Sequence, residues 1–369
     1  MIETDLHDAP EEVTPPGATL GDLMEERGLT QAELSRRLKR PPQAINEIIA
    51  GKKEITEDTA LELERVLQVP AHFWLARDAR YREYLARLRD GELREAQVPW
   101  VETFPLKALQ AAGVLPAGRL TPAFKQQLVD HLLRFFGVAS PQGWAAQYGS
   151  MQAQFRRASP ERQTDTAAIT AWLRMGELAA AKQDVKDHSA QALQAALPQL
   201  RALTLLEAPL IGPELTRLCA AAGVHLVLVP PLPGTHVSGV ARWLGSKPLI
   251  QLSLLGKWND IFWFSFFHEV AHVLKHPTRT IFLDDAAAGG TVDSAEEREA
   301  DRFASDVLIP RARHPELARL QLTTAGINAF ANSLGVHPGI VVGQLQHCAR
   351  IRYDHPLTKL KARDHIAAN

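Results

Sequence analysis

Residues 258–274 constrain the fold more than any other segment, because they join a strongly apolar run to two histidines and a glutamate. The apolar run, residues 258–267, predicts a helix that is buried over most of its circumference. His268 and His272 follow at positions i and i+4, so both imidazoles share one face of that helix. Burying these rings and the Glu269 carboxylate is costly unless partners satisfy them, and a metal ion is such a partner.

The pattern His-Glu-x-x-His contains the residue types that a zinc hydrolase needs. Two neutral imidazoles at this spacing can bind one Zn²⁺. Glu269, next to the first histidine, can take the proton of an attacking water, which is the general-base step of metal-assisted peptide hydrolysis. The alternative is a buried helix whose histidines and glutamate only hydrogen-bond to their neighbours.

A second helix downstream offers the third protein ligand of a catalytic zinc site. Apolar residues recur at helical spacing between Ala300 and Leu308, which predicts an amphipathic helix with one face in the core. Glu297 and Asp301 are also at i and i+4. Glu297 is the expected ligand, and Asp301 is expected to accept the free ring N–H of a ligand histidine.

Glu297 has a rival interpretation at the start of this helix. Ser294 and Glu297 fit a capping box, in which Glu297 would only bind the backbone. Asp293 and Glu296 can cap the helix one residue earlier, and this leaves Glu297 for the metal. Glu296 is the second choice of ligand.

The two motifs HEVAHVLKH and EREADRFASDVLIP, in this order, resemble the ImmA/IrrE metallopeptidases. The resemblance covers roughly residues 208–369. It implies that His268, His272 and Glu297 bind zinc and that Glu269 is the general base.

The same resemblance implies an α+β, zincin-like domain with a small sheet. Short strands are expected at 238–243 and 248–254, before the zinc helix. His276 is also usual in the family. We interpret it as a residue that packs beside the ligands or supports one of them without binding the metal.

The N-terminal segment predicts a helix-turn-helix. A first helix ends near Gly28, a capping box opens a second at Thr30, and a third runs over 42–50. This third helix would be the recognition helix, with outward residues for base edges and flanking residues for phosphates. The residues expected at base edges are Gln43, Ala44, Asn46 and Glu47, and those expected at phosphates are Arg36, Arg37, Lys39, Arg40, Lys52 and Lys53.

Residues 28–75 resemble the Cro/C1-type (XRE) helix-turn-helix of HigA-like antitoxins. The resemblance implies a five-helix, lambda-repressor-like domain that binds double-stranded DNA, with Gln31 at a phosphate-contact position. The alternatives are a small helical bundle with solvated basic residues, or helices that bind protein. Because acidic residues balance the basic ones, we expect modest, salt-sensitive affinity for an operator and a homodimer that binds two half-sites.

Length and composition set the domain plan. The chain has 369 residues, 46% of them hydrophobic, which is enough for two or three domains with real cores. We expect a mainly α protein with a flexible lead at 1–16, the DNA-binding domain at 17–78, a helical bracing region at 79–206 and the peptidase domain at 207–369. Trp100, Trp144 and Trp172 are expected in the core. Residues 326–345 also predict helix, turn, helix, but their apolar second helix favours packing over DNA reading.

The two cysteines, the N-terminal sequence and the lengths of the apolar runs exclude several protein classes. Cys219 and Cys348 are far apart and in no CxxC pattern, which argues against a disulfide framework and favours a reducing cytoplasm. The acidic N-terminus does not resemble a signal peptide, and no apolar run is long enough to span a membrane.

These features predict a DNA-binding transcriptional regulator fused to a zinc endopeptidase. The family resemblance suggests a regulatory protein as substrate, such as a repressor or antitoxin, in a stress or mobile-element circuit. The competing hypothesis is a HigA-like antitoxin or repressor, paired with a cognate toxin, whose zinc domain is structural or sensory. Glu269 argues against it, because a structural site does not require that carboxylate.

Overall fold

The computed structural model describes residues 13–148, 165–235, 237–253, 258–276, 282–284 and 295–363. Most of the expected flexible lead, 1–12, lies outside them. The chain separates into two compact units, Met1–Val98 and Pro99–Asn369. Each unit is described by itself.

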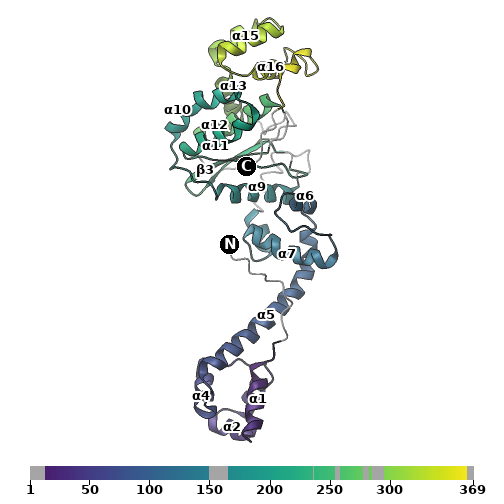
Figure 1. Cartoon of the computed structure of the whole chain (residues 1–369), viewed down its shortest axis with the longest axis vertical. Coiled ribbons are helices and arrows are strands. Elements are labelled where there is room, and N and C mark those ends of the chain that lie inside the picture. Colours follow the sequence, from purple (N-terminus) through teal and green to yellow (C-terminus); the bar gives the residue numbers. More distant parts are fainter. Residues whose placement is uncertain are drawn as a thin grey trace. The chain divides into compact units, whose positions relative to one another are not determined.

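In its described part, the first unit is the expected five-helix arrangement (Figure 1). Its helices are α1 (Pro16–Glu26), α2 (Gln31–Leu38), α3 (Pro42–Ile49), α4 (Glu57–Leu67) and most of α5 (Ala71–Val101), whose last residues belong to the second unit. Thr30 caps α2 by accepting a hydrogen bond from the Glu33 amide at 3.2 Å, as the capping box predicts. One apolar face of each helix meets in a shared core that includes Leu20, Leu34, Ile45, Ile48, Leu63 and Trp74.

The second unit is built on a mixed sheet, whose described part is four-stranded in the order β1-β3-β2-β4. The strands are β1 (His225–Leu228), β2 (Gly239–Leu244), β3 (Lys247–Leu252) and β4 (Phe282–Asp284). Strands β2 and β3 form a hairpin, in which Leu244 pairs with Lys247 and Gly245 turns the chain with φ 63°. This hairpin confirms the two expected strands, whereas β1 and β4 were not predicted.

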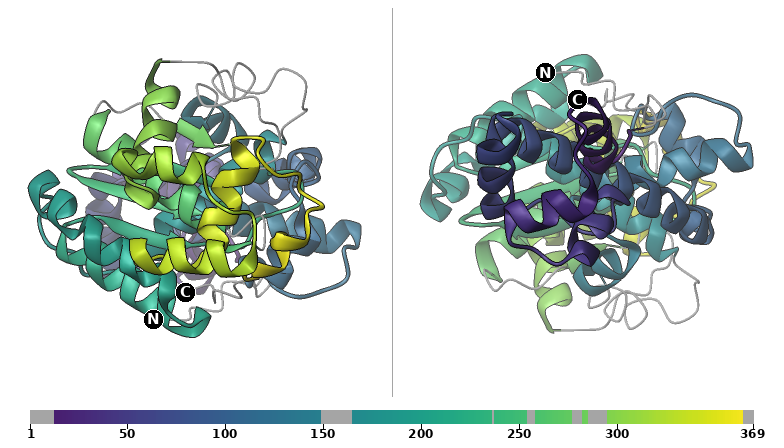
Figure 2. Two further views of the ribbon diagram at one scale, coloured as in Figure 1. Left: turned by 90° about the horizontal axis from the view of Figure 1, so that it is seen from above. Right: turned by 90° about the horizontal axis from the view of Figure 1, so that it is seen from below.

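Helices cover both faces of this sheet, and Figure 1 shows the layers in order. Helix α12 (Asn259–Lys275) packs on β2 and β3 and against α13 (Ala295–Leu308), while α9 (Thr166–Ala180) covers the other face. In the left view of Figure 2, α15 (Thr324–Leu334) and α16 (Pro338–His347), drawn in yellow, lie nearest the viewer.

The middle of the chain contributes directly to this second unit. Its helices α6 (Leu106–Ala111), α7 (Pro122–Phe136) and α9 share a core with the sheet, and α10 (Ala190–Ala202) and α11 (Ala208–Ala221) pack beside α12 and β1. Trp172 donates a hydrogen bond to the carbonyl of Val229 at 3.1 Å. Trp100, Trp144 and Trp172 all lie in or against this core, as expected. The boundary expected at 78/79 falls inside α5.

Residues 326–345 form α15 and α16, joined at Gly335, which has φ 68°. The second helix of this pair is largely buried and packs against α12. This confirms the packing role that its apolar sequence predicts. None of the described helices has the length and apolar character that a membrane span requires.

Candidate metal centre and candidate nucleic-acid interface

Helix α12 carries the His-Glu-x-x-His motif, and contacts with His337, Lys361 and Ala362 anchor its first turn. The Asn259 amide donates to the Ala362 carbonyl at 2.9 Å, and the Asn259 side chain lies 2.8 Å from Nδ1 of His337. Asp260 pairs with the buried Lys361 at 2.6 Å. These contacts hold the first turn in place although no side chain caps the helix.

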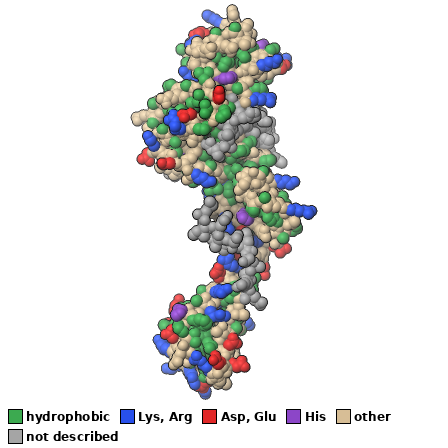
Figure 3. Space-filling view, viewed as in Figure 1, with side chains coloured by type: hydrophobic (Ala, Val, Ile, Leu, Met, Phe, Trp, Pro, Cys, Tyr) green, Lys and Arg blue, Asp and Glu red, His purple; other side chains and the backbone are tan. Residues whose placement is uncertain are grey.

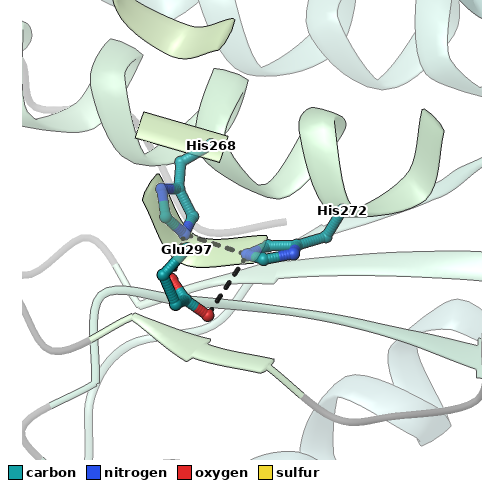
Figure 4. Close-up of side chains that lie close together, drawn as sticks. All are labelled: His268, His272 and Glu297. Atoms are coloured by element: carbon teal, nitrogen blue, oxygen red, sulfur yellow. Dashed lines mark hydrogen bonds and ion pairs between the residues drawn. The ribbon is translucent and has the colours of Figure 1, made fainter. Parts of the chain in front are cut away.

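The three expected ligands converge between α12 and α13 (Figure 4). Nε2 of His268 lies 3.0 Å from Nε2 of His272 and 3.0 Å from Oε2 of Glu297. Nε2 of His272 lies 3.6 Å from Oε1 of Glu297. The exposed fractions of these residues are 1%, 2% and 6%. Among the described residues, this is the one group of donors placed closely enough to hold a metal ion.

The geometry and chemistry of this group fit a divalent metal. Two imidazole nitrogens and one carboxylate oxygen form a donor set of catalytic zinc sites, which leave a further position open. Donors about 2.0–2.2 Å from a tetrahedral ion are themselves about 3.4 Å apart. The observed separations of 3.0–3.6 Å bracket that value. Glu296, the second choice, is exposed and outside the group, and the capping residues 293–294 lie outside the described part.

The electrostatics of the group also suit a cation. Burial raises the pKa of the Glu297 carboxyl, but hydrogen bonds from the rings of His268 and His272 outweigh burial and lower it to about 2. Burial is the largest cause of the lowered pKa of His272, against the opposing effect of Glu297. The group therefore favours an ionised Glu297 carboxylate and a neutral His272 ring, and a metal ion that binds there would replace the ring protons that face Glu297.

Each of the two candidate ligand histidines, His268 and His272, has a partner at its outer nitrogen. Nδ1 of His268 lies 2.9 Å from Oδ1 of Asp301, which places Asp301 as the sequence predicts. Nδ1 of His272 lies 3.2 Å from Nδ1 of His276, whose Nε2 is 3.4 Å from Oε2 of Glu299. Such outer contacts fix the orientation and tautomer of a ligand ring. No role for Glu299 was predicted from the sequence. The only feature of the sequence that could have drawn attention to it is its position two residues after Glu297.

Glu269 is fully buried in the second unit, with an exposed fraction of 0%. It follows the ligand His268 in α12, and its side chain is packed beneath β2, next to Gly239. A general base must lie within reach of the reacting water and have a fixed orientation. The packing of Glu269 supplies the fixed orientation.

Helix α3, the expected recognition helix, exposes Gln43 and Asn46. Glu47 is half-buried and accepts a hydrogen bond from Nε2 of Gln43 at 3.0 Å. The expectation for Ala44 was wrong. Ala44 is only 8% exposed, because its position in α3 places it beside the core residues Ile45 and Ile48 rather than toward a groove.

The basic residues around α3 differ in how freely they can reach a phosphate. Gln31, Lys39, Lys52 and Lys53 are exposed. Arg36 and Arg37 are exposed but both pair with Glu33. Arg40 is half-buried and pairs with Glu62 of α4 at 2.6 Å, a structural contact that the sequence did not reveal. Figure 3 shows acidic and basic side chains intermixed on this unit.

Comparison with known proteins identifies two domains. A family model described as a helix-turn-helix matches residues 20–74, and one described as an IrrE N-terminal-like domain matches residues 259–343. A solved addiction module antidote protein of the HigA family from Coxiella burnetii is 26% identical, with 24% of this chain and 96% of that chain covered and a TM-score of 0.22. None of the curated proteins matches the chain. The chain therefore carries an XRE-type helix-turn-helix domain at its N-terminus and an IrrE-like domain of a peptidase family toward its C-terminus.

Proposed function

We propose that the chain is a DNA-binding transcriptional regulator fused to a zinc-dependent endopeptidase that cleaves a regulatory protein. The observation that carries the proposal is the buried group of His268, His272 and Glu297, with the Glu269 carboxylate on the same helix. The peptidase-family match over 259–343 includes all four residues and supports this assignment.

The chain's own residues divide the chemistry between them. His268, His272 and Glu297 would hold Zn²⁺, which when bound polarises a peptide carbonyl and makes water acidic. Glu269 accepts the proton of the attacking water and returns it to the leaving nitrogen. Asp301 orients His268.

His276 orients the other ligand, His272. Together with Glu299 it forms a chain of contacts that ends at the surface of α13. Because both ligand rings are supported, the donor atoms keep their positions without a large loss of entropy when the ion binds.

The N-terminal domain would direct this peptidase to an operator. Gln43, Asn46 and Glu47 on α3 are proposed to meet base edges, and Gln31, Arg36, Arg37, Lys52 and Lys53 are proposed to meet phosphates. A homodimer would bind two half-sites. We place the protein in the cytoplasm, where the proposed substrate would be a repressor or antitoxin.

The proteolytic half is tested by replacing the general base. Glu269→Gln keeps the size of the side chain but cannot accept a proton, so peptide cleavage should fall by about 10²–10⁴-fold. Cells that express wild type or Glu269→Gln at equal levels are compared by labelling all protein N-termini. Wild type should generate new N-termini that the variant does not.

Two outcomes would contradict this function. If metal-loaded Glu269→Gln generates the same N-termini as wild type, Glu269 is not the base. If neither protein generates any while both bind zinc, the zinc domain is structural or sensory, as in an antitoxin-like repressor.

A further inference from the structure

Strand β2 passes unusually close to the Glu269 side chain at Gly239. A Cβ atom built on Gly239 would lie 2.8 Å from Oε1 and 3.0 Å from Cγ of Glu269, and 2.9 Å from Cδ2 of Leu252. Real Cβ atoms essentially never have neighbours closer than 3.0 Å. A side chain at this position would therefore displace the carboxylate.

Neither partner of this contact can easily move away. Gly239 pairs with Leu252 of β3 on one side and with Asp284 of β4 on the other, so neighbouring strands hold its backbone on both sides. Glu269 is fully buried in α12, and α12 packs against β2, β3 and α13. Two packed elements thus confine the carboxylate, and close-packed interiors relax only partly around an added methyl group.

We propose that Gly239 is a positioning residue for Glu269. The missing side chain lets the carboxylate lie against the backbone of β2, at the depth where it can reach a water beside His268 and His272. The inference rests on the proposed function for its catalytic meaning, but the contact itself can be measured without any substrate. Gly239→Ala should move the carboxylate by several tenths of an ångström, and misplacement near 1 Å can cost about 100-fold in rate.

The first test measures the contact in the metal-free, full-length protein. Gly239→Ala is made in wild type and in Glu269→Ala, and thermal unfolding is followed for all four proteins. In wild type the added methyl should lower the unfolding midpoint by several degrees. In the Glu269→Ala background both close contacts with Glu269 are gone and only the one with Leu252 remains, so the same change should lower the midpoint by clearly less.

A second glycine whose substitution would create a clash, but away from Glu269, provides the matched control. A Cβ on Gly176 of α9 would lie 1.9 Å from Oε1 of Gln251, on the opposite face of the sheet. Gly176→Ala should destabilise the protein equally in both backgrounds. If Gly239→Ala also costs the same in both, the proposal is overturned. If Gly239→Ala does not fold alone, recovery of folded protein in the double variant supports the proposal, and no recovery overturns it.

The second test separates positioning from loss of metal. Gly239→Ala should keep the zinc content of wild type, because none of its close contacts is a ligand, and should reduce Glu269-dependent cleavage by at least about tenfold. Gly143→Ala, whose nearest contacts are ordinary at 3.7 Å, should leave both unchanged. Full cleavage by Gly239→Ala would contradict the positioning role. If Gly239→Ala lowers the unfolding midpoint more in wild type than in Glu269→Ala while wild type cleaves no substrate, the proposed function is contradicted, but the contact between Gly239 and Glu269 is confirmed.

Discussion

The two histidines proposed as metal ligands contact chemically different partners. A carboxylate, Asp301, accepts from the outer nitrogen of His268, whereas an imidazole, His276, faces the outer nitrogen of His272. A carboxylate raises the basicity of the ring that donates to it more than a neutral ring does. The two ligand nitrogens are therefore not equivalent, although the sequence motif makes them look alike.

The residues of the candidate metal centre could be predicted because each pair of them is close in the sequence. His268 and His272 are one helical turn apart, and Glu297 and Asp301 repeat that spacing on another helix, so periodicity alone places each pair on one face. Gly239 could not be predicted, because its role depends on how β2 packs against α12. Ala44 was misplaced for a related reason: its small side chain fits either a core or a surface, and only the packing of α3 decides between them.

Cys219 gives a prediction about thiol chemistry and pH. Burial raises the pKa of its thiol from 9.0 to about 12, so the native protein should not react there with a disulfide reagent at pH 8. Cys348 is exposed and should react. Titration should find one reactive thiol in native protein and two in denaturant.

The same pKa shift sets the direction of a stability change. The unfolded thiol loses its proton at lower pH than the buried one, so this contribution to stability is complete below about pH 9 and is lost as the pH rises toward 12. Cys219→Ala should flatten that part of the pH dependence relative to wild type. Two thiols reacting at once in the native protein would contradict the burial of Cys219.

Helices and strands with a clear periodic spacing of apolar residues could be predicted from the sequence, and very short elements could not. Helices α12 and α13 follow from apolar spacing, and the hairpin β2–β3 follows from its apolar strands. Strand β4 spans only Phe282–Asp284, too few residues for a period to emerge. Helix α5 runs from Ala71 through Val101 and contains Pro99. The domain boundary expected near residue 78 therefore lies inside a continuous helix.

Helix α1 provides a matched pair of glycines. A Cβ on Gly17 would lie 2.2 Å from Cα of Ile49 and 2.3 Å from the carbonyl of Ile48, both backbone atoms of the segment that ends α3. Gly17→Ala should destabilise the first unit by about 2 kcal/mol or more, since backbone cannot move aside cheaply. Gly21, in the same helix, has nothing within 4 Å of its Cβ position, and Gly21→Ala should stabilise by up to about 1 kcal/mol.

Denaturant unfolding of both variants checks this pair. A higher midpoint for Gly21→Ala and a lower one for Gly17→Ala are expected. Equal effects would mean that α1 does not pack against the end of α3 as closely as described. Loss of DNA binding in Gly17→Ala should parallel its loss of stability, because α1 supports the position of α3.

In the whole molecule, the proposed function joins DNA recognition to proteolysis in one chain. The salt dependence of DNA binding tests the first part. The probe is a duplex enriched from a random library by repeated binding, used in gel shifts over a range of salt concentrations. Lys52→Ala with Lys53→Ala should weaken binding to all sequences and reduce the slope of log K against log salt by about 2.

The residues proposed to contact base edges should behave differently. Gln43→Ala with Asn46→Ala should weaken binding to the selected duplex by about 1–3 kcal/mol for each lost base contact while leaving the salt slope nearly unchanged. If wild type and both variants bind no duplex at any salt concentration, the N-terminal helices recognise protein instead of DNA.

The proposed catalytic metal centre of His268, His272 and Glu297 is tested by metal analysis of the purified full-length chain. Wild type and Glu296→Ala, a control on the exposed side of α13, should each retain about one zinc per chain. His272→Ala and Glu297→Ala should lose most of it at the same free zinc concentration, while staying folded. Full retention of zinc by Glu297→Ala would move the third ligand elsewhere, and full retention by His272→Ala would contradict the metal centre itself.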